Sequence, residues 1–222
     1  MSGLRIVIIA KAPAPGLAKT RLIPALGPER AALLARRMLL HTVREARAAA
    51  VGAVELCVSP SVGDPLWATL DPLPEVVWSE QVQGDLGARM TDVAARTLAS
   101  DQRVVLVGTD CPELQAEDFR AAASALENHD SALRPTADGG YALLALRRFH
   151  ASLFEDIPWS TGEVAHITLA RLSGLGWTVH LGAQVHDIDE PGDLAWLPPG
   201  WDPRENSACK HSPGVRDSLA TD

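Results

Sequence analysis

The chain has 222 residues, of which 46% are hydrophobic and 22% are charged, and its formal net charge is -8. These values are ordinary for one globular domain, and the acidic charge argues against a nucleic-acid partner, because a polyphosphate backbone binds basic surfaces. No apolar stretch reaches the roughly 18 residues that a membrane span needs. There is no signal-peptide pattern, and the three cysteines lack disulfide spacing, so we expect a soluble cytoplasmic protein.

Apolar runs rich in β-branched residues alternate along the chain with stretches of helical periodicity. The run at 4–10 predicts a strand, a loop rich in Pro and Gly follows it, and Pro28 begins a helix that extends to about residue 50. Strands at 54–59 and 75–79 precede a helix at 85–99, and 103–108 is the strongest strand pattern. A helix at 115–127, an extended region, a strand at 141–146, a helix at 162–173, a strand at 178–181 and a short helix after Pro191 complete the series.

This alternation is typical of β-α-β crossovers. We predict an α/β fold, a three-layer sandwich with a mostly parallel, Rossmann-like central sheet. Ligands of such sheets bind at the carboxyl ends of the strands, so functional residues are expected in the loops at that edge. The predicted domain covers 1–197, and 198–222, which is rich in turn residues and lacks apolar periodicity, is expected to be a disordered tail.

The loop after the first strand carries three basic residues, Lys11, Lys19 and Arg21, together with Gly16. The glycine permits a tight turn, and the three cations suit a polyphosphate. The alternative is a solvated loop with ordinary surface charges, since the segment matches neither of the common glycine-rich phosphate-binding motifs. The loop sequence leaves both interpretations open.

Asp110 stands at the end of the apolar strand at 103–108. A carboxylate there is costly to bury unless a cation, a hydrogen-bond donor or a metal ion faces it. Mg²⁺ prefers oxygen ligands and often takes only one or two carboxylates, with phosphate and water supplying the rest. Asp110 is therefore a candidate metal ligand, and its alternative role is to cap the helix that starts near Pro112.

A second pair of carboxylates, Asp187 and Asp189, lies near the end of the predicted domain. Alternation along an extended chain points both side chains the same way. Taken alone, the segment is typical of an acidic turn that caps a short helix. Paired with Asp110 across the sheet, it would complete a metal site.

Three further segments are candidate ligand-binding loops. Gln83 and Gly84 offer an amide to a base and backbone N–H groups to an anion, or simply start a helix. The turn at 138–141 carries a carboxylate and a phenol and also suits a hairpin, and Trp159 suits stacking on a sugar or base but equally a core position. The candidates for substrate binding are therefore Asp138, Gly139, Gly140, Tyr141 and Trp159.

Six motifs, starting at residues 11, 83, 108, 138, 159 and 187, follow one another in the order K-x-P-x-P-G-x-x-K-T-R-L, Q-G-D-L-G-x-R-M, G-T-D-C-P, D-G-G-Y, W-S-T and D-I-D-x-P-x-D-L. Over about 6–197, this order resembles the bacterial glycosyltransferase-A-like proteins of the nucleotide-diphospho-sugar transferase superfamily, of the radical-SAM/selenodomain-associated type. More loosely, the chain resembles phospholactate and molybdenum-cofactor guanylyltransferases. The family usually has Gly-Pro where this chain has Arg134-Pro135, which makes Arg134 a candidate for binding an anionic acceptor.

The resemblance implies a nucleotide, Mg²⁺ (or Mn²⁺) and a small-molecule acceptor as partners, with no nucleic acid and no membrane. It implies a triphosphate held around Gly16 by Lys11, Lys19 and Arg21, and a base close to Gln83 and Gly84. It also implies a metal ion held by Asp110 and Asp189, with Asp187 as a further candidate.

Three activities fit this set of residues. The favoured one is nucleotidyl transfer, in which a small phosphorylated acceptor attacks the α-phosphorus of an NTP and pyrophosphate leaves, with Lys11, Arg21 and Asp110 as the catalytic residues. The first alternative is glycosyl transfer from an NDP-sugar, with Asp138 as a candidate base. The second is a nucleotide-binding domain without activity, because a fold does not fix a function.

Overall fold

A computed structural model describes residues 3–70 and 73–205 of the chain. Its seven-stranded sheet has the order β3-β2-β1-β4-β6-β5-β7. The strands are β1 (Gly3–Lys11), β2 (Ala53–Ser59), β3 (Val76–Glu80), β4 (Gln102–Val107), β5 (Ser131–Pro135), β6 (Tyr141–Leu146) and β7 (Val179–Leu181). The α-helices are α1 (Ile23–Leu26), α2 (Pro28–Ala49), α3 (Leu86–Ala99), α4 (Ala116–Asn128) and α5 (Val164–Gly174).

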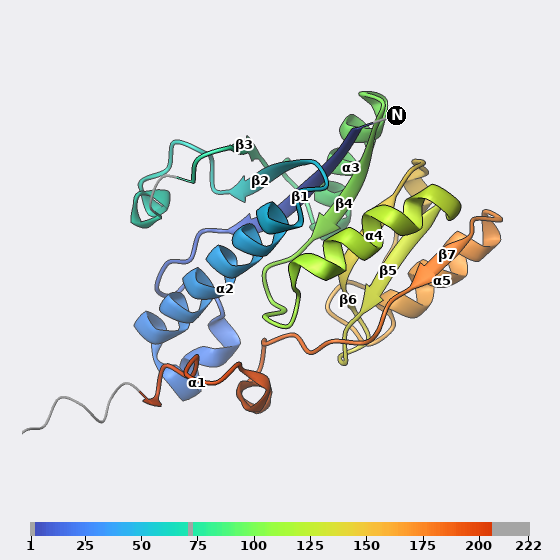
Figure 1. The fold of residues 1–222 in the computed structure, drawn as a ribbon. Coiled ribbons are helices and arrows are strands. Elements are labelled where there is room, and N and C mark those ends of the chain that lie inside the picture. The colour runs from blue at the N-terminus through green and yellow to red at the C-terminus, as the bar shows by residue number, and fades with distance from the viewer. Residues whose placement is uncertain (1–2, 71–72, 206–222) are drawn as a thin grey trace, which may run out of the picture.

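The sheet is mostly parallel. β1 pairs in parallel with β2 and β4, β2 with β3, and β5 with β7, whereas β6 runs antiparallel to its neighbours β4 and β5. Helices α2 and α4 cover one face of the sheet, and α3 and α5 cover the other (Figure 1). The predicted three-layer α/β fold with a Rossmann-like sheet is confirmed.

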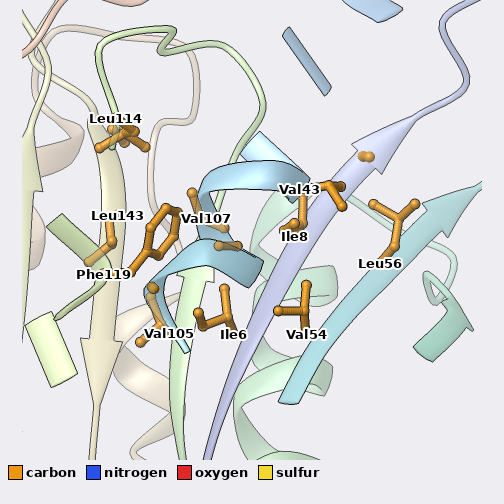
Figure 2. Packing of buried hydrophobic residues seen from close by; sticks show 14 of the residues in the cluster. Ile6, Ile8, Val43, Val54, Leu56, Val105, Val107, Leu114, Phe119 and Leu143 are labelled. Atoms are coloured by element: carbon orange, nitrogen blue, oxygen red, sulfur yellow. The ribbon is translucent and has the colours of Figure 1, made fainter. Parts of the chain in front are cut away.

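The central strand β1 lies between two hydrophobic clusters. Ile6 and Ile8 are fully buried in the cluster that includes residues of α2 and α4 (Figure 2). Val7, which points to the opposite face, is fully buried in the cluster that includes residues of α3 and α5. A strand covered on both faces needs apolar residues at successive positions, which explains the unbroken apolar run in its sequence.

β5 and β6 form an antiparallel hairpin. The strand β5 was predicted only as an extended region, because its apolar part is short. In the turn, Gly139 has a φ of +89°, and a Cβ at this position would lie 2.1 Å from the carbonyl oxygen of Gly162, so only glycine fits. The hairpin interpretation of residues 138–141 is confirmed, and the hairpin brings Tyr141 to the edge of the sheet at which β1 and β4 end.

A third cluster joins the C-terminal segment to the first helices. Ile188 and Leu194 are buried against Leu22, Leu34 and Met38. Leu194 belongs to a 3₁₀ helix, Pro191–Trp196, in the orange-to-red segment that passes the end of the sheet toward α1 in Figure 1. This packing carries the acidic segment at 187–189 to the loop that follows β1.

The ordered chain continues beyond residue 197, where the predicted domain ends. Trp201 packs against the third cluster, with the guanidinium of Arg37 4.4 Å from its ring centroid and the ring of His41 edge-on to it. Residues 206–222, the remainder of the expected disordered tail, lie outside the described residues. Over the described ranges, no helix is long and apolar enough to cross a membrane.

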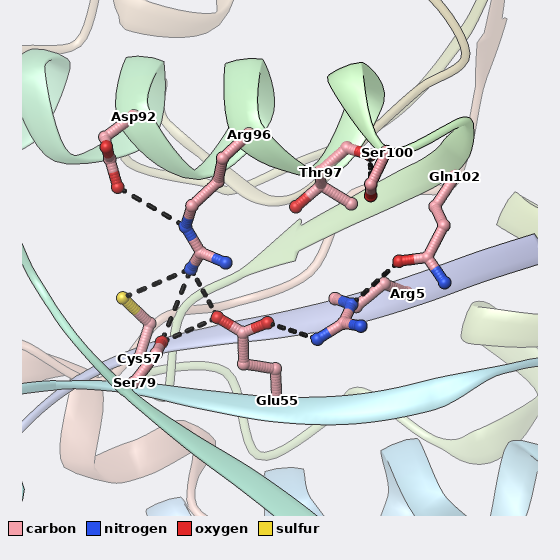
Figure 3. A network of polar contacts seen from close by, with 9 residues as sticks. All are labelled: Arg5, Glu55, Cys57, Ser79, Asp92, Arg96, Thr97, Ser100 and Gln102. Carbon is pink, nitrogen blue, oxygen red and sulfur yellow. Dashed lines mark hydrogen bonds and ion pairs between the residues drawn. The ribbon is translucent and has the colours of Figure 1, made fainter.

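A buried carboxylate joins three strands and a helix (Figure 3). Glu55 of β2 is 1% exposed and accepts hydrogen bonds from Arg5 of β1 at 2.8 Å, from Ser79 of β3 at 2.6 Å and from Arg96 of α3. A buried charge is tolerated when it is paired and hydrogen-bonded in this way. Glu55 therefore has a structural role.

Candidate functional site

A cavity of about 650 Å³ opens at the carboxyl ends of β1 and β4. The loop after β1, the β5–β6 turn, the segment before α5 and the segment at 187–189 contribute to its walls. The predicted site residues that line it are Lys11, Lys19, Arg21, Gly84, Asp110, Asp138, Gly140, Tyr141, Trp159 and Asp189, together with Asp187. The predicted residues Gly16, Gln83 and Gly139 do not line the cavity.

Lys19 is the central cation of the site. Its backbone is left-handed, with a φ of 50°, where the loop turns into a 3₁₀ helix, Thr20–Leu22. Its side chain is only 5% exposed, and its ammonium lies 2.7 Å from Asp110 Oδ1 and 3.7 Å from Asp189 Oδ1. It also donates a hydrogen bond to the carbonyl oxygen of Ile188. Lys19 therefore joins β1's loop, the end of β4 and the C-terminal segment.

Arg21 makes a more exposed contact with the same segment. Its Nη1 lies 2.7 Å from Asp189 Oδ2 and 4.0 Å from Glu190 Oε1. Asp189 is thus neutralised by two cations. Its backbone N–H and that of Glu190 both donate to the Asp193 carboxylate, which fixes the acidic turn.

The backbone connects the two acidic segments directly. The N–H of Ile188 donates to the carbonyl oxygen of Asp110 at 2.9 Å. Because Ile188 is fully buried and hydrogen-bonded to Asp110, it brings the flanking carboxylates of Asp187 and Asp189 into the lining of the same cavity. The expected proximity of these carboxylates to Asp110 is therefore present in the structure.

Asp187 and Asp138, which line the same cavity, form no such close ion pair with Lys19 or Arg21. Burial raises the pKa of Asp187 to about 6, and the nearby negative charge of Asp138 adds to that shift. Burial also raises the pKa of the Cys111 thiol well above its usual range, with contributions from Asp110 and Asp187. Cys111 is consequently a packing residue, because its thiol stays protonated at neutral pH.

The donor atoms of the cavity suit a divalent cation of the Mg²⁺ type. In the part of the chain that the structure describes, no three His, Cys, Asp or Glu side chains form a group that could hold a metal ion by themselves. Mg²⁺ is nevertheless often bound by one or two carboxylates, with phosphate and water completing its shell. Asp110 and Asp187 both line the cavity, and a cation there would offset both the burial of the Asp187 carboxylate and the negative charge of Asp138, which together raise the pKa of Asp187.

Asp138 is held in a defined orientation within the hairpin turn. Its Oδ1 accepts hydrogen bonds from Thr136 Oγ1 at 2.5 Å and from the backbone N–H of Gly140 at 2.9 Å. Its Oδ2 accepts no hydrogen bond from the described residues, and the side chain is exposed at the cavity. This oxygen is available to a ligand.

Two site residues, Gln81 and Arg89, are missing from the prediction. The Gln81 amide donates to the carbonyl oxygens of Ala10 and Cys57 at 2.8 and 2.9 Å and accepts from Arg89 Nη1 at 2.8 Å. Both residues line the cavity, whereas the predicted Gln83 is exposed outside it. Sequence alone offers no means of choosing between two glutamines two positions apart, although Arg89 stands inside the quoted Q-G-D-L-G-x-R-M motif.

Arg134, the candidate for an anionic acceptor, lies elsewhere. It pairs with Asp118 of α4 and does not line the cavity. The pair with Asp118 joins β5 to α4.

Known proteins provide the following matches. The family described as "Uncharacterized protein conserved in bacteria (DUF2064)" matches residues 42–161. A protein from Desulfovibrio desulfuricans G20, provisionally named a nucleotide-diphospho-sugar transferase, is 30% identical with a TM-score of 0.80, over 87% of this chain and 85% of that one. No curated protein matches the sequence.

Two more distant structures share the fold. The CMP:2-keto-3-deoxy-manno-octonic acid synthetase in complex with CTP is 15% identical with a TM-score of 0.56, over 88% of this chain and 96% of that one. A cytidylyltransferase from Leptospira borgpetersenii serovar Hardjo-bovis is 13% identical with a TM-score of 0.52, over 89% and 88%. The fold is therefore that of nucleotide-diphospho-sugar transferases and cytidylyltransferases, and the chain belongs to the DUF2064 family of bacterial proteins.

Proposed function

We propose that this protein is a metal-dependent transferase that moves a sugar from a nucleotide-diphospho-sugar to a small acceptor. The observation that carries the proposal is that carboxylates and basic side chains line one cavity at the carboxyl ends of β1 and β4. The 30% identity to the Desulfovibrio protein and the motif order of the radical-SAM/selenodomain-associated type support the same class.

The basic residues favour a diphosphate over a triphosphate. The Lys19 ammonium has three N–H donors, and it already contacts Asp110, Asp189 and the Ile188 carbonyl oxygen. Arg21 is paired with Asp189. Three groups remain for a ligand: the other N–H donors of Arg21, the Lys11 ammonium, and the N–H donors of Arg89 that do not contact Gly84 or Gln81. They are enough for the two phosphates of a nucleoside diphosphate.

Asp110 and Asp187 would hold the metal ion. When bound, Mg²⁺ or Mn²⁺ would neutralise the charge of the diphosphate leaving group. Asp189 instead keeps the basic loop in place through Lys19 and Arg21. In this assignment Asp187 takes the place of Asp189 in the metal-binding pair that the sequence favoured, Asp110 and Asp189.

Asp138 is the proposed general base. A hydroxyl oxygen of the acceptor attacks the anomeric carbon and forms a new C–O bond. The bond between that carbon and the β-phosphate oxygen breaks, and the nucleoside diphosphate leaves with the electron pair. The hydroxyl proton passes to Asp138 Oδ2, the carboxylate oxygen that no described residue occupies.

Nucleotidyl transfer is the second candidate. Four basic residues, Lys11, Lys19, Arg21 and Arg89, line the cavity, which favours a highly charged donor if Lys19 leaves its carboxylate partners. In that reaction an acceptor oxygen attacks the α-phosphorus of an NTP, and pyrophosphate leaves with the electron pair.

The two candidates are separated by the product that leaves. The protein is incubated with Mg²⁺ and separate panels of NDP-sugars and NTPs, with pooled acceptors, and the phosphate products are followed by ³¹P NMR and mass spectrometry. We expect nucleoside diphosphate release from an NDP-sugar, and no release by Asp138→Asn above the uncatalysed rate. Pyrophosphate release from an NTP, with the NDP-sugars left intact, would overturn the proposal in favour of nucleotidyl transfer.

A further inference from the structure

The charges that line the cavity are divided between its two halves. The basic lining residues Lys11, Lys19, Arg21 and Arg89 come from the end of β1, the loop after it and α3. The half formed by the β5–β6 turn, the segment before α5 and the segment at 187–189 contributes no Lys, Arg or His to the lining. Its charged residues are Asp138, Asp187 and Asp189, and of these Asp189 pairs with Lys19 and Arg21 of the basic half.

The arginines of β5 and α5, and the two that follow β6, are held by other partners. Arg134 pairs with Asp118, and Arg147 and Arg148 both pair with Asp130. Arg171 of α5 donates to the carbonyl oxygens of Ser152 and Glu155. None of these four side chains lines the cavity, so a phosphate placed beside Asp138 meets a carboxylate with no Lys, Arg or His from this half to offset it.

The same half provides apolar rings and hydroxyl groups. Tyr141 and Trp159 line it, with the Tyr141 hydroxyl 3.8 Å from Met90 Sδ. The Thr161 hydroxyl donates to the carbonyl oxygen of Pro158 and lines the cavity beside Ser160. Aromatic faces next to hydroxyl and carboxylate oxygens suit the C–H faces and O–H groups of a cyclic polyol.

We infer that the acceptor is an uncharged, hydroxyl-bearing molecule of the sugar or cyclic-polyol class, and that it carries no phosphate or carboxylate. The inference rests on the proposed function and adds to it the class of acceptor that would bind in the second half of the cavity. It also differs from the activity favoured by the sequence, in which the acceptor is a small phosphorylated molecule.

The test uses a matched pair of probes, p-nitrophenyl β-glucoside and p-nitrophenyl phosphate. Each is titrated by calorimetry into the full chain with Mg²⁺ and a saturating mixture of UDP, GDP, CDP and ADP. We expect the glucoside to bind at least tenfold more tightly than the phosphate. Equal or tighter binding of the phosphate, or no measurable binding of the glucoside, would overturn the inference.

A charge variant adds a second measurement, the affinity for p-nitrophenyl phosphate, which a purely structural role of the residue would not raise. Asp138→Asn removes one negative charge from this half, and we expect it to raise the affinity for p-nitrophenyl phosphate at least fivefold while changing glucoside affinity less. Glu117→Gln, on the exposed surface of α4, removes the same charge away from the cavity and serves as the control. An unchanged phosphate affinity in Asp138→Asn would contradict the inference.

Failure of the proposed function is distinguishable from failure of the inference. Binding of the nucleotide mixture with Mg²⁺ is measured first, without either probe. If no nucleotide binds, the proposed function fails. If nucleotide binds and the phosphate probe is preferred, only the acceptor class fails.

Discussion

At the scale of single residues, the carboxylates of the cavity have different surroundings and therefore different roles. Asp189 contacts Lys19 and Arg21, whereas Asp187 lies near Asp138 and has a pKa raised by burial and by that like charge. Asp110 is contacted by Lys19 but remains half exposed at the cavity. A metal ion would compete with Lys19 for Asp110, whereas at Asp187 it would meet only the longer-range charge of Lys19.

Asn substitutions at the three positions test this assignment. Asp110→Asn and Asp187→Asn should each weaken the Mg²⁺-dependent part of nucleoside diphosphate binding at least tenfold, because each removes a proposed ligand. Asp189→Asn should change it less than threefold and instead increase amide hydrogen exchange in 19–22, since Lys19 and Arg21 lose a partner. Calorimetry with and without Mg²⁺ measures the first effect. A tenfold loss in Asp110→Asn and Asp189→Asn, but not in Asp187→Asn, would restore the pair predicted from the sequence.

At the scale of elements, tight backbone approaches and one buried segment position the site. The β5–β6 turn passes against Gly162 before α5, and the C-terminal segment lies against α1 and α2 through the third cluster. The position of Asp138 depends on the approach of the turn to Gly162, and the position of Asp189 depends on the third cluster. Both carboxylates are thus placed by packing between segments far apart in the chain.

Gly139→Ala tests the approach of the turn. The added Cβ would lie 2.1 Å from the Gly162 carbonyl oxygen at a φ of +89°, so the hairpin must shift. We expect the free energy of unfolding, measured by urea denaturation, to fall by roughly 2–4 kcal/mol. Gly63→Ala is the matched control, because a Cβ there meets nothing within 4 Å, and it should change stability by about 0.5 kcal/mol or less.

Trp201→Ala tests whether the chain beyond residue 197 belongs to the folded domain. The substitution removes the contacts with Arg37, His41 and the third cluster. We expect a loss of about 1–2 kcal/mol in unfolding free energy, less than for a fully buried tryptophan because the ring is partly exposed. A loss below about 0.5 kcal/mol, the ordinary size for a surface substitution, would place the domain boundary near 197 instead.

At the scale of the whole molecule, the polar network around Glu55 ties the strands β1, β2 and β3 to α3 (Figure 3). Burial alone would raise the pKa of Glu55, but hydrogen bonds from Arg96, Ser79 and Arg5 lower it below its ordinary value of 4.5. A folded-state pKa below that of the unfolded chain contributes stability that is complete above the unfolded value. That stability is lost as the pH falls through the folded value.

The unfolding free energy should therefore decrease as the pH falls below about 4.5, and part of this decrease should be absent in Glu55→Gln. At neutral pH, Glu55→Gln should cost about 3 kcal/mol, because it leaves Arg5 and Arg96 without their carboxylate. Urea denaturation of both proteins from pH 3 to pH 7 measures the two effects. Parallel pH profiles for the two proteins would show that Glu55 is not the responsible group.

The local sequence was sufficient to predict most of the elements and the edge at which the site lies. The apolar runs of β1, β4 and β6 are buried on both faces, so their composition alone reveals them. Pro28 at the start of α2 and the loops between elements are similarly local features. The positions of Asp110 and of the basic loop at strand ends follow from the parallel sheet.

Other features of the site depend on packing between distant segments, and only the tertiary structure reveals them. Gln81 rather than Gln83 lines the cavity because its amide reaches the carbonyl oxygens of Ala10 and Cys57 on two other strands. Asp189 contacts Lys19 because Ile188 is buried against α1 and α2, a contact between residues about 170 positions apart that no local pattern encodes. Sequence by itself determined which chemical groups follow the predicted parallel strands, and the carboxyl ends of parallel strands lie at one edge of the sheet. Only the packing of distant segments decided which of those groups face one another, because that depends on buried contacts across the whole chain.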